Sequence, residues 1–302
     1  MIAARIAAVA LMTLPCVAGT SFLAACRPAA DVPARPTGAQ ASRIICLGPN
    51  VTELVFALGA GDRVVGVSDF CDYPADAAGR QRVGGAITPN LEKILELRPD
   101  LVIVAGEQQK TADLCRRNNI GVLNVQADSI EGVCASAMLV GERLGKSEEA
   151  RKLCDRIRAD LDAVRKRTAG RPRPRVFLCL WRSPESLSGL ASASAQGFLG
   201  EVLEVAGGEN IFADLPQSYS QVSKEELVAR RPDVVIELRP GEHLSAGRVE
   251  RLVADWQELA KLPAVKNHRV YVLTQDFLML PGPRIALAAG ALADVIHPEA
   301  GP

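Results

Sequence analysis

Cysteine and histidine are the residue types of this chain best suited to metal binding or covalent catalysis. The 302 residues include eight cysteines and three histidines. No two cysteines form a C-x-x-C pair. The histidines, His243, His268 and His297, all lie in the second half without the spacing of a ligand pair. Because a bare metal ion needs three or four convergent imidazoles or carboxylates, we do not expect a metal site.

Motifs of enzyme active sites are not recognisable either. The stretch Leu144 to Glu148 resembles the end of a phosphate-binding loop, but Val140 replaces the glycine required five residues before Gly145. Gly59 to Asp62 follows a predicted helix rather than a strand, so we interpret it as a helix stop and not a dinucleotide loop. There is no G-x-S-x-G elbow, and no histidine lies near a plausible nucleophile. We therefore expect a protein that is not an enzyme.

Composition and charge indicate a globular protein without nucleic-acid partners. Apolar residues make up 48% and charged residues 23%, and the 35 basic residues balance the 35 acidic ones. No basic patch is evident, and aromatic residues are only 4%, so both the electrostatic and the stacking contacts of nucleic-acid binding are lacking. The length favours two domains or lobes.

The first 26 residues have the pattern of a lipoprotein signal peptide. Arg5 is the only charge before an apolar run from Ile6 to Leu14, and small residues lead into Cys26. We expect export and lipid attachment at Cys26. The alternative is an uncleaved membrane helix from Ile6 to Ala25, although proline, glycine and hydroxyl residues interrupt that run.

Residues 27–42 are rich in proline, alanine and polar residues and have no periodicity, which is typical of a flexible tether. The folded body is then expected outside the cytoplasmic membrane, in the periplasm or at the cell surface, held by a lipid anchor. Six cysteines remain for this body, and two interpretations stay open. They form disulfides whose pairing the sequence does not determine, or they are small buried hydrophobic residues.

The elements that must position any site alternate between short apolar strands and helices, as in α/β proteins. In the first half, Asn50 is a candidate helix cap with Glu53 three residues on, and Asp128 is another with Glu131. The remaining predicted strands and helices of this half cover residues 43–47, 63–67, 90–97, 101–105, 111–118 and 122–125. In the second half, the predicted elements cover residues 175–180, 197–205, 223–238, 248–260, 269–273 and 283–296.

One helix and strand pair occurs twice. Residues 90–104 and 223–238 align so that Glu92 falls on Glu225 and Asp100 on Asp233. Between the halves, apolar residues recur at helical spacing from Ser147 to Thr168, which predicts one uninterrupted helix roughly 33 Å long. We therefore expect an N-terminal α/β lobe over 43–146, a connecting helix over 147–169 and a C-terminal α/β lobe over 170–302.

Several motifs resemble the periplasmic cobalamin-binding protein family, whose relatives bind haem or ferric siderophores. They are VVGVSDFCDYP, VGGAITPNLEKILELRPDLVIV, FLGEVLEVAGGENIFAD, QVSKEELVARRPDVVIEL and PGPRIALAAGALADVI, in the family's order. The resemblance implies two Rossmann-like lobes with central parallel sheets, joined by one long backbone helix. It also implies a monomeric substrate-binding protein of an ABC importer, without a cofactor of its own.

The partner implied by the resemblance is an ABC permease dimer with its ATPase. In this family each lobe presents a glutamate to arginines of the permease, and the matching residues are Glu92 and Glu225. Equivalent charges on two pseudo-symmetric lobes would suit a two-fold symmetric partner. The alternative is that each glutamate only complements the dipole at the start of its helix.

The ligand is expected between the lobes, at the loops that follow the strand ends. A corrinoid or porphyrin presents a broad flat face, so aromatic walls with a few polar groups are expected. Arg182 would pair with an acidic group of a siderophore or haem, or it is an ordinary surface arginine. The candidate ligand-binding residues are Asn50, Phe70, Tyr73, Trp181, Arg182, Tyr219, Asp276 and Phe277.

The chain departs from the cobalamin binder at two cleft positions. Ala86 stands where that protein has a tryptophan, and Tyr219 matches its other cleft tryptophan. The loop 276–281 is also more apolar. We expect a corrinoid ligand, with haem or a ferric siderophore as the alternative within this class. A sensory or scaffold lipoprotein that has kept the fold without transport is a further alternative.

Overall fold

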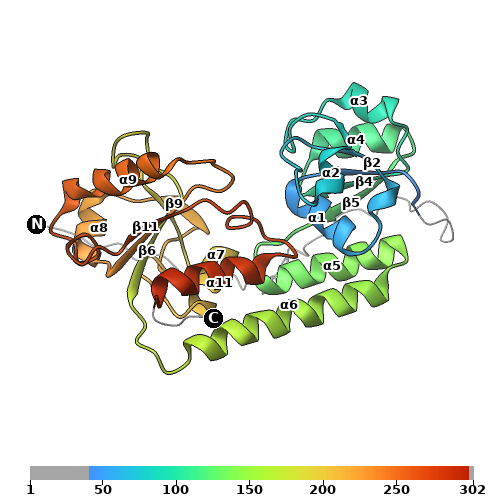
Figure 1. Ribbon diagram of the computed structural model, residues 1–302. Helices are drawn as coiled ribbons and strands as arrows, with labels where there is room; N and C mark the ends of the chain where they lie inside the picture. Colours follow the sequence, from blue (N-terminus) through green and yellow to red (C-terminus); the bar gives the residue numbers. More distant parts are fainter. Residues whose placement is uncertain (1–40, 299–302) are drawn as a thin grey trace, which may run out of the picture. The chain divides into compact units, whose positions relative to one another are not determined.

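The computed structural model describes residues 41–298. The predicted signal peptide, Cys26 and most of the predicted tether lie outside these residues. The described part contains two parallel sheets flanked by helices, and a long helix, α6, lies between them in the sequence (Figure 1). This is the predicted α/β organisation. Within residues 41–298, no helix combines the length and the hydropathy needed to span a bilayer.

The first sheet has five parallel strands in the order β3-β2-β1-β4-β5. The central pair is in register from Ile44 opposite Leu101 to Leu47 opposite Val104, and both strands are buried, as expected for a sheet covered on two faces. The strands are β1 (Ile44–Leu47), β2 (Val64–Val67), β3 (Gln81–Arg82), β4 (Leu101–Ala105) and β5 (Gly121–Val125). The helices are α1 (Pro49–Ala57), η1 (Gly61–Arg63), α2 (Ala75–Ala78), α3 (Leu91–Glu96), α4 (Gln109–Arg117) and α5 (Ile130–Leu144).

The second sheet has four parallel strands in the order β11-β10-β6-β8, and a separate antiparallel pair, β7-β9, lies beside it. The strands are β6 (Arg175–Cys179), β7 (Ala191–Ala193), β8 (Glu209–Asn210), β9 (Tyr219–Gln221), β10 (Val234–Leu238) and β11 (Val270–Leu273). The helices are α7 (Phe198–Val205), α8 (Lys224–Arg230), α9 (Ala246–Asp255), η2 (Trp256–Leu259), α10 (Pro263–Lys266) and α11 (Ile285–Ile296).

The helix α6 spans Ser147–Thr168, 22 residues, as the sequence predicts. Its buried side chains lie on one face, which packs against α5 and α11 (Figure 1). Gly141 of α5 permits the close approach, because a Cβ there would lie 2.6 Å from the Cβ of Ala150. Buried side chains of α5, α6, α7 and α11 form one continuous hydrophobic cluster with strands of both sheets.

The repeated segment is built from the same hydrogen bonds in both lobes. The Asp100 carboxylate accepts from the backbone N–H of Arg43 at 3.1 Å, and Asp233 accepts from that of Arg175 at 3.0 Å. The guanidinium groups of these two arginines donate to carbonyl oxygens at the ends of α3 and α8, respectively. In both lobes, these hydrogen bonds join the helix to the strand that comes first in the chain, β1 or β6. They explain why the aspartate occurs twice.

Two predicted helix caps are wrong by one or two residues. The helix α1 has Gly48 as its cap, with a φ of 131° that glycine adopts easily, and Pro49 occupies the first helical position. Asn50 therefore lies inside the helix and does not cap it. At α5 the cap is Ser129, whose side chain accepts from the N–H of Gly132 at 2.9 Å, in place of Asp128.

The six cysteines within residues 41–298 are all free and buried, which agrees with the second of the two interpretations. Burial raises the pKa of the Cys115 thiol to about 11. The same part of the chain contains no group of three or more histidine, cysteine, aspartate and glutamate side chains arranged to hold a metal ion.

Candidate ligand-binding site

The loops after the carboxyl ends of the parallel strands carry most of the predicted site residues. Phe70 and Tyr73 follow β2, Trp181 follows β6, and Asp276 and Phe277 follow β11. In open α/β sheets these loops form the ligand crevice. The sequence pattern alone places the residues at these strand ends, and the structure confirms those positions in the fold.

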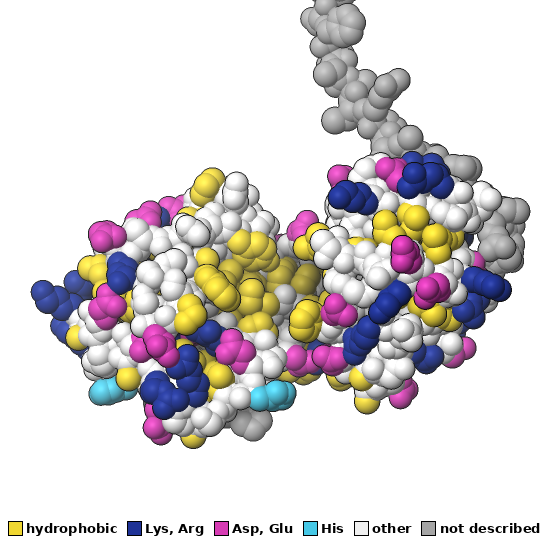
Figure 2. Space-filling model, turned by 90° about the horizontal axis from the view of Figure 1, so that it is seen from above, with side chains coloured by type: hydrophobic (Ala, Val, Ile, Leu, Met, Phe, Trp, Pro, Cys, Tyr) yellow, Lys and Arg dark blue, Asp and Glu magenta, His cyan; other side chains and the backbone are white. Residues whose placement is uncertain are grey.

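A hollow of about 400 Å³ is lined by both lobes. Figure 2 shows hydrophobic side chains gathered in the hollowed region of one face. The first lobe contributes Pro49, Glu53, Phe70, Asp72 and Tyr73. The second lobe contributes Pro240, Gly241, Glu242, Asp276, Leu280 and Arg284. The hollow thus brings together three predicted residues, Phe70, Tyr73 and Asp276.

Phe70 is the most unusual of these residues. Its side chain is 82% exposed, and its φ of 65° lies in the left-handed region, which costs a non-glycine residue free energy. An exposed phenyl ring in a strained backbone contributes little to folding. Such a combination is typical of functional sites, where strain is tolerated because the side chain contacts a ligand.

Trp181 and Tyr219 flank the strand β7 on its two sides, Trp181 after β6 and Tyr219 in β9. Trp181 forms a bridge with Ala191, and Tyr219 pairs with Ala193 in the next strand. Because side chains alternate along a strand, the two alanines share one face, and their aromatic partners lie on that face with them. Trp181 is 62% exposed. Burial and the nearby Asp128 raise the pKa of the half-buried Tyr219 to about 12.

A second hollow of about 270 Å³ adjoins the first and has Trp181 in its lining. The two share Pro240 and Glu242. Arg239 lines the second hollow, where its Nη2 lies 2.7 Å from Glu237 and its Nη1 lies 3.4 Å from Glu242. The candidate site is therefore one elongated cleft with exposed aromatic side chains at both ends.

Two charged side chains on the floor of the cleft, Glu53 and Arg284, are not among the site residues predicted from the sequence. Arg284 Nε donates to Glu53 at 2.9 Å and its Nη1 donates to Asp276 at 3.0 Å. These hydrogen bonds lower the pKa of Asp276, whereas desolvation raises that of Glu53 despite the arginine. Glu53 and Arg284 are 231 positions apart, so no local spacing could reveal the pair. The only signal was the PGPR stretch that precedes α11.

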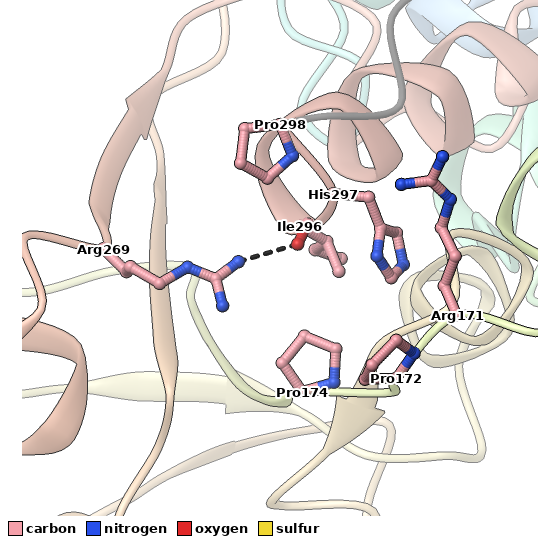
Figure 3. A pocket seen from close by; sticks show the side chains of 7 residues that line it. All are labelled: Arg171, Pro172, Pro174, Arg269, Ile296, His297 and Pro298. Carbon is pink, nitrogen blue, oxygen red and sulfur yellow. Dashed lines mark hydrogen bonds between the residues drawn. The ribbon is translucent and has the colours of Figure 1, made fainter.

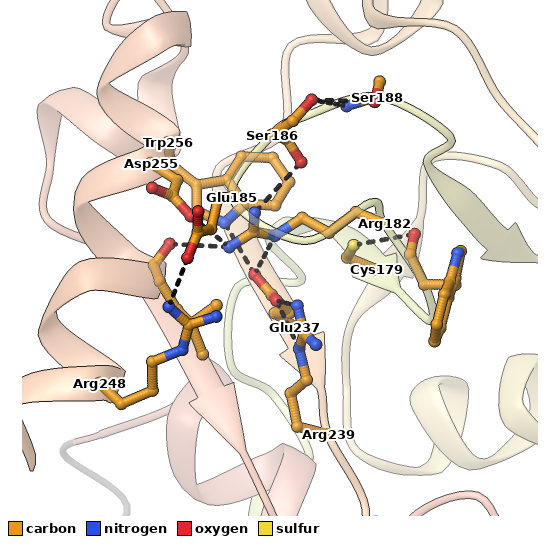
Figure 4. Close-up of polar contacts among 12 residues, drawn as sticks. Cys179, Arg182, Glu185, Ser186, Ser188, Glu237, Arg239, Arg248, Asp255 and Trp256 are labelled. Carbon is orange, nitrogen blue, oxygen red and sulfur yellow. Dashed lines mark hydrogen bonds and ion pairs between the residues drawn. The ribbon is translucent and has the colours of Figure 1, made fainter. Parts of the chain in front are cut away.

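Arg182 lines the second hollow, but its guanidinium is buried and paired within the second lobe, so it is neither a surface arginine nor free to pair with an acidic ligand group. The residue is 1% exposed. Its Nε donates to Glu237 at 3.0 Å and its Nη2 donates to Asp255 at 2.9 Å (Figure 4). Its Nη1 and Nη2 also donate to the carbonyls of Ser186 and Leu252, respectively. With its hydrogen-bonding capacity used inside the second lobe, Arg182 fixes the loop that follows Trp181.

Two other predicted residues lie at the edge of the cleft. Asn50 packs against the backbone of Gly282, where a Cβ on the glycine would lie 3.7 Å from the Asn50 Cβ, and it does not line either hollow. Phe277 is partly buried against the core, and its ring centroid is 5.4 Å from the Arg284 guanidinium. Phe277 therefore packs against Arg284 and is not one of the exposed rings of the cleft.

Glu92 and Glu225 occupy equivalent places in the two lobes. Each lies in the first turn of its helix, α3 or α8, and each is exposed. Asn90 caps the first helix, and Ser223 forms a capping box with Glu226 in the second. Since other residues cap both helices, the two carboxylates remain at the surface.

A separate hollow of about 360 Å³ lies at the end of α11, beside the amino ends of β6 and β11 and away from the carboxyl ends of the strands (Figure 3). Arg269 Nη2 donates to the carbonyl of Ile296 at 2.7 Å and so satisfies the end of the helix. His297 packs against Gly207, where a Cβ would lie 2.7 Å from its Nε2. These contacts are structural, and the hollow includes none of the predicted site residues.

Comparison with known proteins identifies the family. A family model described as periplasmic binding protein matches residues 44–277. The vitamin B12-binding protein of Vibrio cholerae is 34% identical over 248 residues, 81% of this chain and 85% of that protein. The solved structure of the V. cholerae periplasmic vitamin B12-binding protein has a TM-score of 0.70 and 30% identity, covering 85% of this chain and 96% of that one. A periplasmic heme-binding protein from Pseudomonas aeruginosa has a TM-score of 0.75 and 25% identity, covering 87% and 95%. The chain belongs to the periplasmic binding protein family, whose members are solute-binding proteins of ABC importers.

Proposed function

We propose that this protein captures a corrinoid in the cleft between its lobes and delivers it to an ABC importer. The proposal rests on one observation: the cleft combines exposed aromatic rings with a surplus of carboxylates. The first hollow is lined by four carboxylates and one guanidinium. A corrin ring offers a broad apolar face to the aromatic side chains, and its peripheral amides donate hydrogen bonds that carboxylates accept.

The charges on the cleft floor argue against an acidic ligand. Arg284 is paired with Glu53 and Asp276, and Arg239 is paired with Glu237 and Glu242. A haem propionate or a siderophore carboxylate would need to displace one of these partners or face the surplus carboxylates at close range. Cyanocobalamin carries no net charge. The 34% identity to a vitamin B12-binding protein supports the same choice of ligand.

Export and anchoring form part of the proposal. The signal pattern that ends at Cys26 provides for lipid attachment, and residues 27–42 would tether the folded body to the membrane. The anchor keeps the protein near the permease, which raises its effective concentration there. No cofactor is required, because the corrinoid is cargo and ATP is hydrolysed by the partner.

Delivery would proceed by docking of both lobes. Glu92 and Glu225, exposed at the start of equivalent helices, would meet basic residues on the two halves of the permease. Because the rigid helix α6 packs on both lobes through the continuous core, ligand binding would close the cleft only slightly. Separation of the lobes by the permease would then lower the affinity and release the ligand.

The experiment that tests the proposal is equilibrium binding of cyanocobalamin to the purified protein and to the Trp181→Ala/Tyr219→Ala variant. We expect submicromolar affinity for the parent and a loss of about tenfold or more for the variant, because stacking area at both sites is removed. Val228→Ala, an exposed apolar residue on α8, is the matched control and should bind normally. Absence of saturable binding to the parent protein would overturn the proposal.

A further inference from the structure

We propose that Arg284 is a positioning residue that clamps the two lobes together across the floor of the cleft. The arginine precedes α11 of the second lobe, and Glu53 lies in α1 of the first. The inference rests on the proposed function only for its effect on the ligand. The clamp itself is a property of the protein alone.

The geometry of the clamp is bidentate. Arg284 Nε lies 2.9 Å from one Glu53 carboxylate oxygen, and Nη2 lies 2.5 Å from the other. The same guanidinium donates to both oxygens of Asp276, at 3.0 and 2.8 Å. Paired hydrogen bonds of this kind fix orientation as well as distance. Arg284 therefore sets the position of one lobe's helix relative to the other lobe's strand-end loop.

The clamp also organises the aromatic wall. The Arg284 guanidinium carbon lies 3.9 Å from the centroid of the Tyr73 ring, and 5.4 Å from that of Phe277. Cations at such distances over aromatic faces are attracted to them. Tyr73 belongs to the first lobe and Phe277 to the second, so one guanidinium holds cleft residues of both lobes through its faces and its edges.

Burial makes the pair costly to separate. Arg284 has a side chain that is 13% exposed, and that of Glu53 is 3% exposed. If the lobes moved apart without water entering, Glu53 would become a buried carboxylate without a partner, which is strongly unfavourable. A second contact reinforces the arrangement, because Glu201 of α7 accepts from the N–H of Ile130 at the start of α5, at 2.7 Å.

A clamp at this position explains how a cleft of fixed width is held before the ligand arrives. The Glu53 to Arg284 pair keeps the aromatic and acidic side chains at the spacing that a flat ligand requires, so less conformational freedom is lost on binding. Opening of the cleft by a partner would break the pair. The clamp therefore raises both the affinity for the ligand and the free energy that the partner must supply to open the cleft.

The test measures the lobe separation directly. Spin labels are attached to Lys110→Cys on α4 and Glu250→Cys on α9, both exposed. The six cysteines of the folded body are buried, so they should not react. Distance distributions are recorded by double electron–electron resonance for the parent, for Glu53→Gln and for Arg284→Met. Arg167→Met is the control, since it removes an ion pair to Asp294 on the same helix α11 outside the cleft.

We expect the distribution to broaden and shift to longer distances in both clamp variants and to remain unchanged in the control. Glu53→Gln keeps the size of the side chain, so it separates the clamp from effects on folding. Unchanged distributions in both clamp variants would overturn the inference. The cyanocobalamin dissociation rate should also rise roughly tenfold in the clamp variants, as for loss of charged hydrogen bonds. Failure of the parent to bind cyanocobalamin would contradict the proposed function, whereas the distance measurement would still decide on the clamp.

Discussion

Arg182 and Glu237 form an ion pair inside the second lobe, with 3.0 Å between Nε and Oε2, and both side chains are almost completely buried. Glu237 also accepts from the indole N–H of Trp256 at 3.1 Å. Trp181, the residue before Arg182, is among the most exposed large apolar residues of the described chain. The buried network thus fixes the backbone from which Trp181 projects. Arg182 builds the site, and Trp181 is the residue proposed to contact the ligand.

Removal of this arginine should destabilise the fold. In Arg182→Met, Glu237 and Asp255 lose their buried partner, and the free energy of unfolding should fall by about 3 kcal/mol or more. Urea denaturation measures the change. Arg158→Met, which breaks an exposed pair with Glu131, is the control and should cost about 1 kcal/mol or less. Equal effects of the two substitutions would contradict the structural role of Arg182.

Substitutions at Phe70 should weaken ligand binding with little effect on stability. Glycine adopts the left-handed conformation without steric cost, so Phe70→Gly should be at least as stable as the parent, and Phe70→Ala slightly less stable. Both variants should bind cyanocobalamin about tenfold more weakly, because an exposed ring of the cleft is lost. Thermal unfolding and equilibrium titration measure the two properties. Unchanged affinity in both variants would remove Phe70 from the site.

The docking glutamates should affect transport without affecting binding. In Glu92→Lys and Glu225→Lys, charge repulsion with a basic permease surface should abolish uptake, while ligand affinity stays within about twofold of the parent. Glu96→Lys, in the last turn of α3, and Glu250→Lys, in α9, carry the same charge change at exposed positions outside the proposed contact. Uptake of labelled cyanocobalamin into cells with the cognate importer is the measurement. Normal uptake by both docking variants would contradict docking. The only remaining role of Glu92 and Glu225 would be to complement the dipoles of their helices.

The phenol of Tyr219 provides a test, by pH, of the electrostatics around β9. Burial and Asp128 raise its pKa to about 12, so the neutral phenol is favoured in the folded state. Its contribution to stability is present below the ordinary pKa of about 10 and is lost as the pH rises through 12. The phenolate absorbance of the parent minus that of Tyr219→Phe should titrate near 12, and Asp128→Asn should lower that midpoint. A midpoint near 10 would show that Tyr219 is not in this environment.

Local chemistry explains which elements could be predicted from the sequence. The helix α6 has the predicted limits, because its apolar stripe is regular and Gly170 adopts a φ of 75° just beyond it. The predicted elements that begin at residues 90 and 223 are also confirmed, with Asn90 and Ser223 as the caps of their helices. The prediction failed where more than one nearby residue could serve as the helix cap. Because Pro49 occupies the first helical position, the cap of α1 is Gly48 and not Asn50.

The parts that could not be predicted depend on contacts between distant residues. The strands β7 and β9 contain small residues such as Ala191 and Ser192, which lack the β-branched pattern of strands. The aromatic residues that line the cleft could be predicted because, in open α/β sheets, ligands bind at the loops after the carboxyl ends of the strands. Glu53 and Arg284 were not found, since their pairing joins two lobes. The sequence also cannot distinguish the buried Arg182 from an arginine that faces a ligand.

The measurement that tests the central claim most directly is a comparison of ligands on the parent protein. Cyanocobalamin, haemin and a ferric hydroxamate are titrated into it under the same conditions, and binding is followed by equilibrium dialysis. An acidic aromatic cleft should bind cyanocobalamin with submicromolar affinity and haemin at least tenfold more weakly, because the propionates meet paired arginines and surplus carboxylates. Tighter binding of haemin, or of the ferric complex, than of cyanocobalamin would contradict the account.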